Sequence, residues 1–239
     1  MKSILIPTVL ENDTLQAIET AISHARGKSA SIVLLTLTET PDALSAAEFL
    51  RKTRKPLTAA QSELLEECSL RVAASANCTL EVRNQYGITA SLLRNLLDFL
   101  ATDMVILSQS YKADKKKINS YFCKLISTCK KPILHLGSEN ACPEFNKALY
   151  IERNNTRIGL QELQQLVNVQ FDFRIVSQAS VAEEQNPEGF APLVNEAIAK
   201  NGIDLLIETR KPKAVQRAPL VSDGYGLPVL SIHEEAARV

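Results

Sequence analysis

Four lysines lie in a short polar segment that follows an apolar stretch near the middle of the chain. The apolar stretch, DMVILS at residues 103–108, is typical of a buried strand, and residues 118–129 have a helical pattern. In an open α/β sheet, ligands bind beyond the carboxyl ends of the strands, where the next helix offers free N–H groups to an anion. The segment therefore has the position of an anion site, and its lysines are Lys112, Lys115, Lys116 and Lys117.

This segment contains no glycine between residues 103 and 129. A phosphate cradle normally requires glycine, because only glycine lets the backbone wrap closely around the anion. Two interpretations follow. The lysines bind an anion as point charges at a helix N-terminus, or the segment is a solvated loop left from a former site.

The cysteines and histidines offer little for metal binding or catalysis. The five cysteines form no CxxC pair, and the three histidines lie far apart in the sequence. We expect free thiols, as in a reducing cytoplasm. The chain also lacks a GxSxG elbow, a P-loop, a GxGxxG and an HExxH motif, so the sequence predicts neither a catalytic residue nor a metal site.

The composition excludes several classes of protein. Of the 239 residues 45% are hydrophobic, which suffices for a buried core in one or two domains. Lys plus Arg and Asp plus Glu both number 27, which argues against a strongly basic protein that binds nucleic acid or a membrane surface. The N-terminus does not read as a signal peptide, and no run approaches the roughly eighteen apolar residues of a membrane span. A cytoplasmic location is expected.

The elements that position the lysine-rich segment alternate between strand and helix. This alternation predicts a parallel sheet covered by helices on its faces. Apolar runs predict strands at residues 3–8, 31–37, 79–85, 103–108 and 131–136.

The second half of the chain repeats the first in abbreviated form. SILIPT near the N-terminus has an echo in KALYIE, and CKKPILHL at 129–136 matches YGLPVLSI at 225–232. Only residues 171–177 lie where the first copy has two strands, so the second copy has lost one strand–helix unit. We predict two homologous domains, 1–140 and 145–239, the second of them truncated.

The ordered set ILIPT, LQAIETAISHA, SIVLLTLTE, ATDMVILS and CKKPILHLG resembles the universal stress protein family in its tandem form. The resemblance spans about residues 1–137, with a weaker match over 145–234. It implies two open parallel-sheet α/β domains of the adenine-nucleotide α-hydrolase-like type, the second truncated. Many members of that family bind ATP, and they pair through their last strands.

The family's ATP-binding members carry G-x2-G-x9-G-[ST] from the end of the fourth strand. The three glycine positions of this motif fall here on Ser108, Tyr111 and Asn119, and the loop is two residues short. Only the hydroxyl of Ser120 survives. Tyr111 brings a Cβ and a ring to a place where the backbone must approach phosphate, although Asn119 tolerates a left-handed conformation.

The end of the first strand also departs from the family pattern. Val9, after Thr8, stands where the family tends to have an aspartate near the adenine and ribose. In the second copy the corresponding residues are Glu152 and Arg153, and Glu208 ends the fourth strand. The nucleotide site therefore reads as degenerate in both copies, and no cofactor is expected, with ATP and AMP as the disfavoured alternatives.

These features predict a non-catalytic bacterial stress-response protein that acts through a protein partner or an unidentified ligand. The alternative is a nucleotide or anion sensor that uses the lysine-rich segment. A hydrolase is the weakest reading, because no nucleophile–base pair is present. The candidates for ligand contacts are Thr8, Val9, Ser108, Tyr111, Lys115, Lys116, Asn119 and Ser120.

The resemblance also implies how the two copies are joined. Residues 132–136 and 228–232, the last strand of each copy, are expected to pair inside one chain as a pseudo-dimer, which would cover their exposed edges. A homodimer of whole chains is a further alternative.

Overall fold

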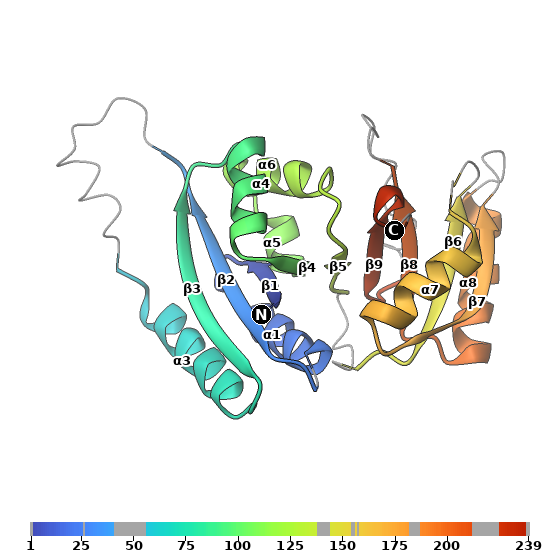
Figure 1. Cartoon of the computed structure of the whole chain (residues 1–239), viewed down its shortest axis with the longest axis horizontal. Helices are drawn as coiled ribbons and strands as arrows, with labels where there is room; N and C mark the ends of the chain where they lie inside the picture. Colours follow the sequence, from blue (N-terminus) through green and yellow to red (C-terminus); the bar gives the residue numbers. More distant parts are fainter. Residues whose placement is uncertain are drawn as a thin grey trace.

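The computed structural model describes residues 2–25, 27–40, 56–137, 144–153, 156, 158–181, 187–211 and 225–237 (Figure 1). The first half contains β1 (Lys2–Pro7), α1 (Asp13–His24), β2 (Ala30–Thr38), α3 (Ala59–Ala73), β3 (Cys78–Tyr86), α4 (Ala90–Phe99), β4 (Thr102–Leu107), α5 (Gln109–Ala113), α6 (Lys117–Ile126) and β5 (Ile133–His135). The second half contains β6 (Lys147–Arg153), α7 (Leu160–Gln170), β7 (Arg174–Val181), α8 (Pro187–Asn201), β8 (Leu205–Arg210), β9 (Val229–His233) and the 3-10 helix η2 (Glu234–Ala237).

All nine strands belong to one sheet, in the order β3-β2-β1-β4-β5-β9-β8-β6-β7. Every neighbouring pair is parallel except β5 and β9, which are antiparallel. The predicted fold class is confirmed, because each half is an open parallel sheet wrapped by helices. The second half is shorter: its order β7-β6-β8-β9 repeats β2-β1-β4-β5, without a described counterpart of β3. The division into domains at 1–140 and 145–239 stays a prediction, and residues 138–143 lie outside the described part.

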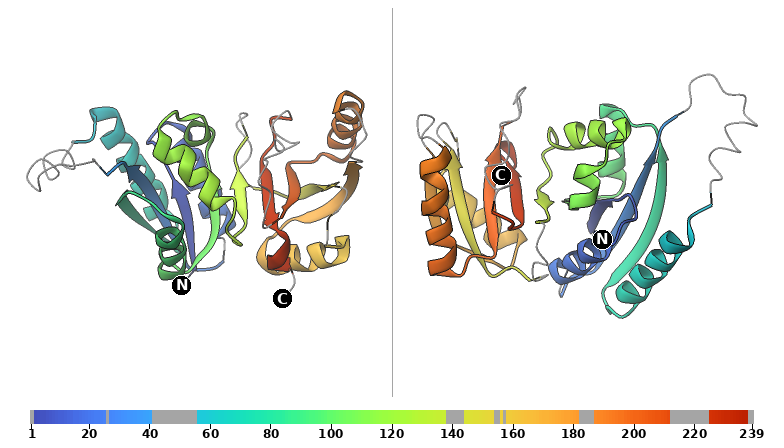
Figure 2. Two further views of the ribbon diagram at one scale, coloured as in Figure 1. Left: turned by 90° about the horizontal axis from the view of Figure 1, so that it is seen from above. Right: turned by 180° about the vertical axis from the view of Figure 1, so that it is seen from behind.

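Apolar side chains on the two faces of the sheet are organised differently. On one face α1, α3 and α7 cover a single cluster that runs through both halves. On the other face α4, α5 and α6 cover a cluster in the first half, and α8 covers a separate one in the second. Figure 2 shows α7 and α8 on opposite faces of the second half. The halves therefore share a core on the α1 face only.

The two halves meet where β5 pairs with β9. Leu134 lies opposite Leu230, and both side chains are buried in the shared cluster. Beyond the end of β5 the two backbones approach closely: a Cβ on Gly137 would lie 2.0 Å from the carbonyl oxygen of Gly226. Only glycine fits at residue 137, since real Cβ atoms do not tolerate such a contact.

Two details of the sequence prediction need correction. Part of the expected lysine-rich loop is the short helix α5, because the Ser108 side chain accepts a hydrogen bond from the Tyr111 N–H and caps it. Glu208 does not end its strand, since β8 continues to Arg210 and Glu208 is buried.

Candidate functional site

The predicted ligand site lies beyond the carboxyl ends of β1 and β4, where the strand order reverses direction. Thr8 follows β1 and Ser108 follows β4, and because these strands are parallel neighbours both residues lie at the same edge of the sheet. Both side chains are buried. Val9 is half-buried and packs against the apolar cluster of the α4–α6 face.

A carboxylate of the chain itself lies at this edge of the sheet, where open α/β folds have their ligand crevice. Asp13, at the start of α1, accepts a hydrogen bond of 2.7 Å from the Ser110 N–H and one of 2.6 Å from the Ser110 hydroxyl. Ser110 belongs to the first turn of α5, so Asp13 satisfies a main-chain donor that an anion would otherwise meet. This contact ties α1 directly to the segment after β4.

The turn after β1 is fixed by a second set of hydroxyl contacts. The hydroxyl of Thr8 lies 2.8 Å from that of Thr14 and accepts a hydrogen bond of 2.8 Å from the Leu10 N–H. Leu10 has a φ of 60°, a left-handed conformation that is unfavourable for a non-glycine residue. Its side chain is buried, and this burial offsets the cost of the conformation.

Tyr111 and Asn119 are interior residues. The Tyr111 ring packs edge-on against Phe122 with centroids 6.0 Å apart, and its hydroxyl donates to the Asn119 carboxamide oxygen at 3.3 Å. The Asn119 amide in turn donates to Asp114 at 2.6 Å. Burial raises the pKa of Tyr111 far above its usual range, so it remains a neutral donor. Both side chains are buried in the interior.

The lysines of the segment point in different directions. Lys112 donates to the carbonyl oxygen of Leu136 at 3.3 Å and so links α5 to the end of β5. Lys115 and Lys116 are exposed, as is Ser120 one turn further along α6. The predicted candidates therefore divide into buried side chains within the crevice and exposed ones outside it.

In the second half, the described polar side chains near the carboxyl ends of β6 and β8 bond to neighbouring strands. Glu152, after the middle of β6, accepts hydrogen bonds from Gln178 and Ser180 of β7. Arg210, at the end of β8, donates to the carbonyl oxygen and hydroxyl of Ser231 on β9. Burial lowers the pKa of Arg210 to about 10, so it is still charged at neutral pH.

Sequence reasoning missed Asp13 and Ser110 as members of the site. The sequence offers Asn12 or Asp13 as a cap for α1, but no capping side-chain bond is present there, and the Asp13 carboxylate bonds to Ser110, 97 residues away. Only the position of Asp13, five residues after Thr8 at the ligand-binding edge, could have pointed to it. Among the described residues no cluster of three or more metal-ligating side chains exists, and no helix is long and apolar enough to cross a membrane.

Solved structures of other proteins share this architecture. A universal stress protein from Archaeoglobus fulgidus DSM 4304 aligns over 97% of this chain and 96% of its own, with a TM-score of 0.57 and 11% identity. The fold is that of the universal stress proteins. A second solved structure of this fold, a universal stress protein candidate from Pseudomonas aeruginosa UCBPP-PA14, aligns over 99% of this chain and 98% of its own, with a TM-score of 0.51 and 12% identity. No family model and no curated protein matches the sequence.

Proposed function

We propose that this chain is a member of the universal stress protein family whose nucleotide site is closed, and that it acts without catalysis. Its role is in a cytoplasmic stress response, through a protein partner or through a ligand bound elsewhere. The observation that carries the proposal is the contact of Asp13 with Ser110 at the carboxyl ends of β1 and β4. The universal-stress-protein fold shared with the Archaeoglobus protein supports the assignment to the family.

Electrostatic repulsion disfavours a nucleotide phosphate at this position. A phosphate at the start of α5 would have to displace the Asp13 carboxylate from Ser110 and would then lie beside a like charge. The charge-assisted hydrogen bonds lost in that exchange are each worth about 1.5–3 kcal/mol. The buried Tyr111 ring adds bulk where the family motif has glycine.

Duplication of one domain accounts for the topology of the second half. We infer that the two halves descend from one domain, and that the second lost the unit corresponding to β3 while it kept the strand that joins the halves. Pairing of β5 with β9 then takes the place of a contact between two chains, and the remaining surfaces serve an unidentified protein partner.

The test is thermal unfolding with and without millimolar Mg·ATP, ADP and AMP. Binding to the native state alone would raise stability by about 2.7 kcal/mol at 100 times the dissociation constant. We expect no shift of the midpoint for the native chain. Asp13→Asn, which removes the charge but keeps the size, is compared with Glu11→Gln, an exposed carboxylate nearby. A clear shift of the midpoint in the native chain, whatever the result for Asp13→Asn, would overturn the closed site.

An anion sensor is the second candidate, and one observation favours it. Lys116 caps α6 without a side-chain hydrogen bond, and Lys115 and Lys117 beside it are also exposed. Such a sensor would bind anions with a strong salt dependence. The double change Lys115→Glu and Lys116→Glu would abolish binding, whereas Lys124→Glu, near the other end of the same helix, would not.

A further inference from the structure

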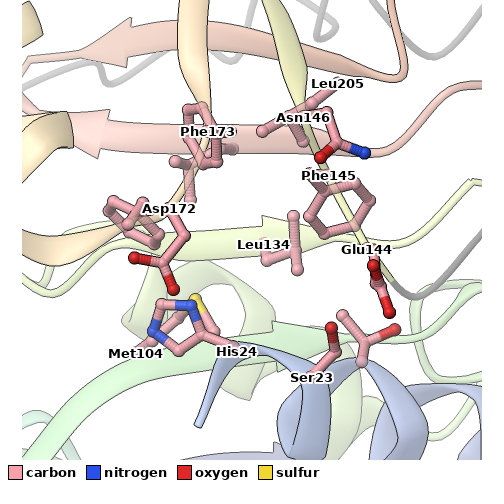
Figure 3. A pocket seen from close by; sticks show the side chains of 13 residues that line it. Ser23, His24, Met104, Leu134, Glu144, Phe145, Asn146, Asp172, Phe173 and Leu205 are labelled. Atoms are coloured by element: carbon pink, nitrogen blue, oxygen red, sulfur yellow. The ribbon is translucent and has the colours of Figure 1, made fainter. Parts of the chain in front are cut away.

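A pocket of about 140 Å³ opens between the two halves on the α1 face of the sheet (Figure 3). His24, at the last position of α1, lines it, whereas Asp13 of the closed crevice is at the first position of that helix. The two positions are about 16 Å apart along the helix axis. The pocket is therefore separate from the crevice at the carboxyl ends of β1 and β4.

The floor of the pocket is aliphatic and comes from both halves. Four neighbouring strands, β4, β5, β9 and β8, each contribute one buried side chain. These side chains are Met104, Leu134, Leu230 and Leu205. A ligand on this floor would contact both sides of the junction at once.

One wall of the pocket is aromatic. His24 and Phe171 have ring centroids 5.1 Å apart, and Phe171 and Phe173 are 5.3 Å apart. His24 belongs to the first half, and the phenylalanines flank Asp172 in the turn between α7 and β7. The row of rings offers stacking partners to a ring of the ligand and quadrupole attraction to a cation.

The charged groups that line the pocket are acidic. Figure 3 shows Asp172 beside His24 at one end, and Glu144 near Ser23 at the other. Burial lowers the pKa of His24, so its imidazole is neutral at neutral pH and does not cancel the charge of Asp172. Within the described part of the chain no ion pair joins Asp172 to a cationic side chain.

We propose that this pocket is a binding site for a small ammonium compound with a single ring or a branched alkyl body. The aliphatic floor and the phenylalanines take the apolar body, and Asp172 at the mouth pairs with the ammonium group. The volume suits this class, because a cavity of about 150 Å³ accommodates benzene. The acidic rim selects against carboxylates and phosphates of the same size.

This site does not depend on the closure of the nucleotide crevice. Its probe is benzylamine, with benzyl alcohol as the neutral analogue and benzoate as the anionic one. Binding is measured on the full chain by the shifts of assigned backbone amide signals during titration. We expect saturable shifts at lining residues from α1, β9 and the α7–β7 turn, with benzylamine the tightest and a dissociation constant of about 1 mM or below.

Three variants separate the contributions of charge and space. Asp172→Asn should weaken the affinity for benzylamine about fivefold and leave the affinity for benzyl alcohol unchanged, since an exposed ion pair contributes at most about that factor. Asp98→Asn, an exposed aspartate on the α4 face, should leave all affinities unchanged. Ser23→Phe places a ring at the rim and should abolish binding of every probe while the chain stays folded.

Several results would overturn the proposal. Shifts that do not saturate, or that centre on other residues, would exclude the site. Equal affinity for benzylamine and benzoate, or no effect of Asp172→Asn, would exclude the ammonium class. A nucleotide-induced shift in the unfolding experiment would affect only the closed-crevice proposal and leave this site standing.

Discussion

The guanidinium group of Arg210 lies 2.7 Å from the carbonyl oxygen of Cys129, and it also donates to the carbonyl of Lys131. Arg210 ends β8 in the second half, whereas both carbonyls belong to the segment before β5 in the first. Together with the bonds to Ser231, one side chain thus joins β8 and β9 to the first half. The contacts that join the two halves are therefore polar as well as apolar.

Replacing Arg210 tests how much this contact stabilises the junction. Arg210→Met should lower the free energy of unfolding by about 2–3 kcal/mol, because buried carbonyls lose a charged donor. The free energy of unfolding of Arg210→Lys should lie between those of the native chain and of Arg210→Met, since an ammonium group cannot reproduce the planar fork of the guanidinium. Denaturant unfolding measures both, and Arg94→Met, at an exposed position on α4, is the matched control. A methionine variant as stable as the native chain would show that the contact contributes nothing net.

The close approach of the backbone at Gly137 to that at Gly226 can be tested by substitution. Gly137→Ala should weaken the junction, because its Cβ would lie 2.0 Å from the Gly226 carbonyl oxygen and the two backbones would have to separate. A loss of about 1–3 kcal/mol is expected, as for other overpacked sites. Gly159→Ala is the control, since nothing lies within 4 Å of a Cβ there. Equal stabilities for the two variants would contradict the close approach.

Two histidines, the half-buried His24 and the buried His233, predict a decrease in stability in mild acid. Burial lowers the pKa of both His24 and His233 in the folded chain from the ordinary 6.5. The unfolded chain therefore binds protons more readily, and stability should fall as the pH drops below about 6.5. The charges that face His24 are Asp103, Lys28, Asp172 and Lys2, and those that face His233 are Arg210, Glu235 and Lys130.

Denaturation midpoints between pH 7.5 and pH 5 measure this effect. His24→Gln and His233→Asn should each flatten the profile, and the double variant should flatten it most. Asparagine keeps an acceptor near the His233 Nδ1 atom, which accepts from the Glu235 N–H at 3.2 Å. A slope that survives in the double variant would assign the loss to other groups.

We expect the cysteines to differ in reactivity, because they differ in burial. Cys68 is a fully buried residue of α3, and burial raises the pKa of its thiol to about 11, so it should not react with a disulfide reagent in the native chain. Cys68→Ser should leave the native titration unchanged and remove one of the five thiols titrated in denaturant. Cys78→Ser, at a half-buried position, is the comparison. Fewer native thiols after Cys68→Ser would show that α3 opens readily.

The strands and their parallel arrangement could be read from the sequence, since covered strands are continuous apolar runs at regular spacing. The prediction for residues 31–37 agrees with β2 to within one residue at each end, and 79–85 agrees with β3 equally well. Strand β5 is shorter than residues 131–136, because only three of them pair with neighbours. Burial on both faces imposes such patterns locally, which makes them visible without tertiary information.

The absence of glycine after β4 was also visible in the sequence, but the contact of Asp13 with Ser110 was not. Asp13 and Ser110 are 97 residues apart, and no local pattern records their contact. The same holds for Arg210 and the carbonyl of Cys129, 81 residues away. Hydrogen bonds of this kind depend on where the sheet places the ends of distant strands.

The sequence by itself therefore determined the α/β fold and the absence of glycine after β4, because periodicity and backbone sterics act between near neighbours. Only the tertiary structure decided that the crevice contains the chain's own carboxylate and that a pocket opens between the halves. Both features arise where separate elements meet, and their geometry follows from the packing of the nine-stranded sheet.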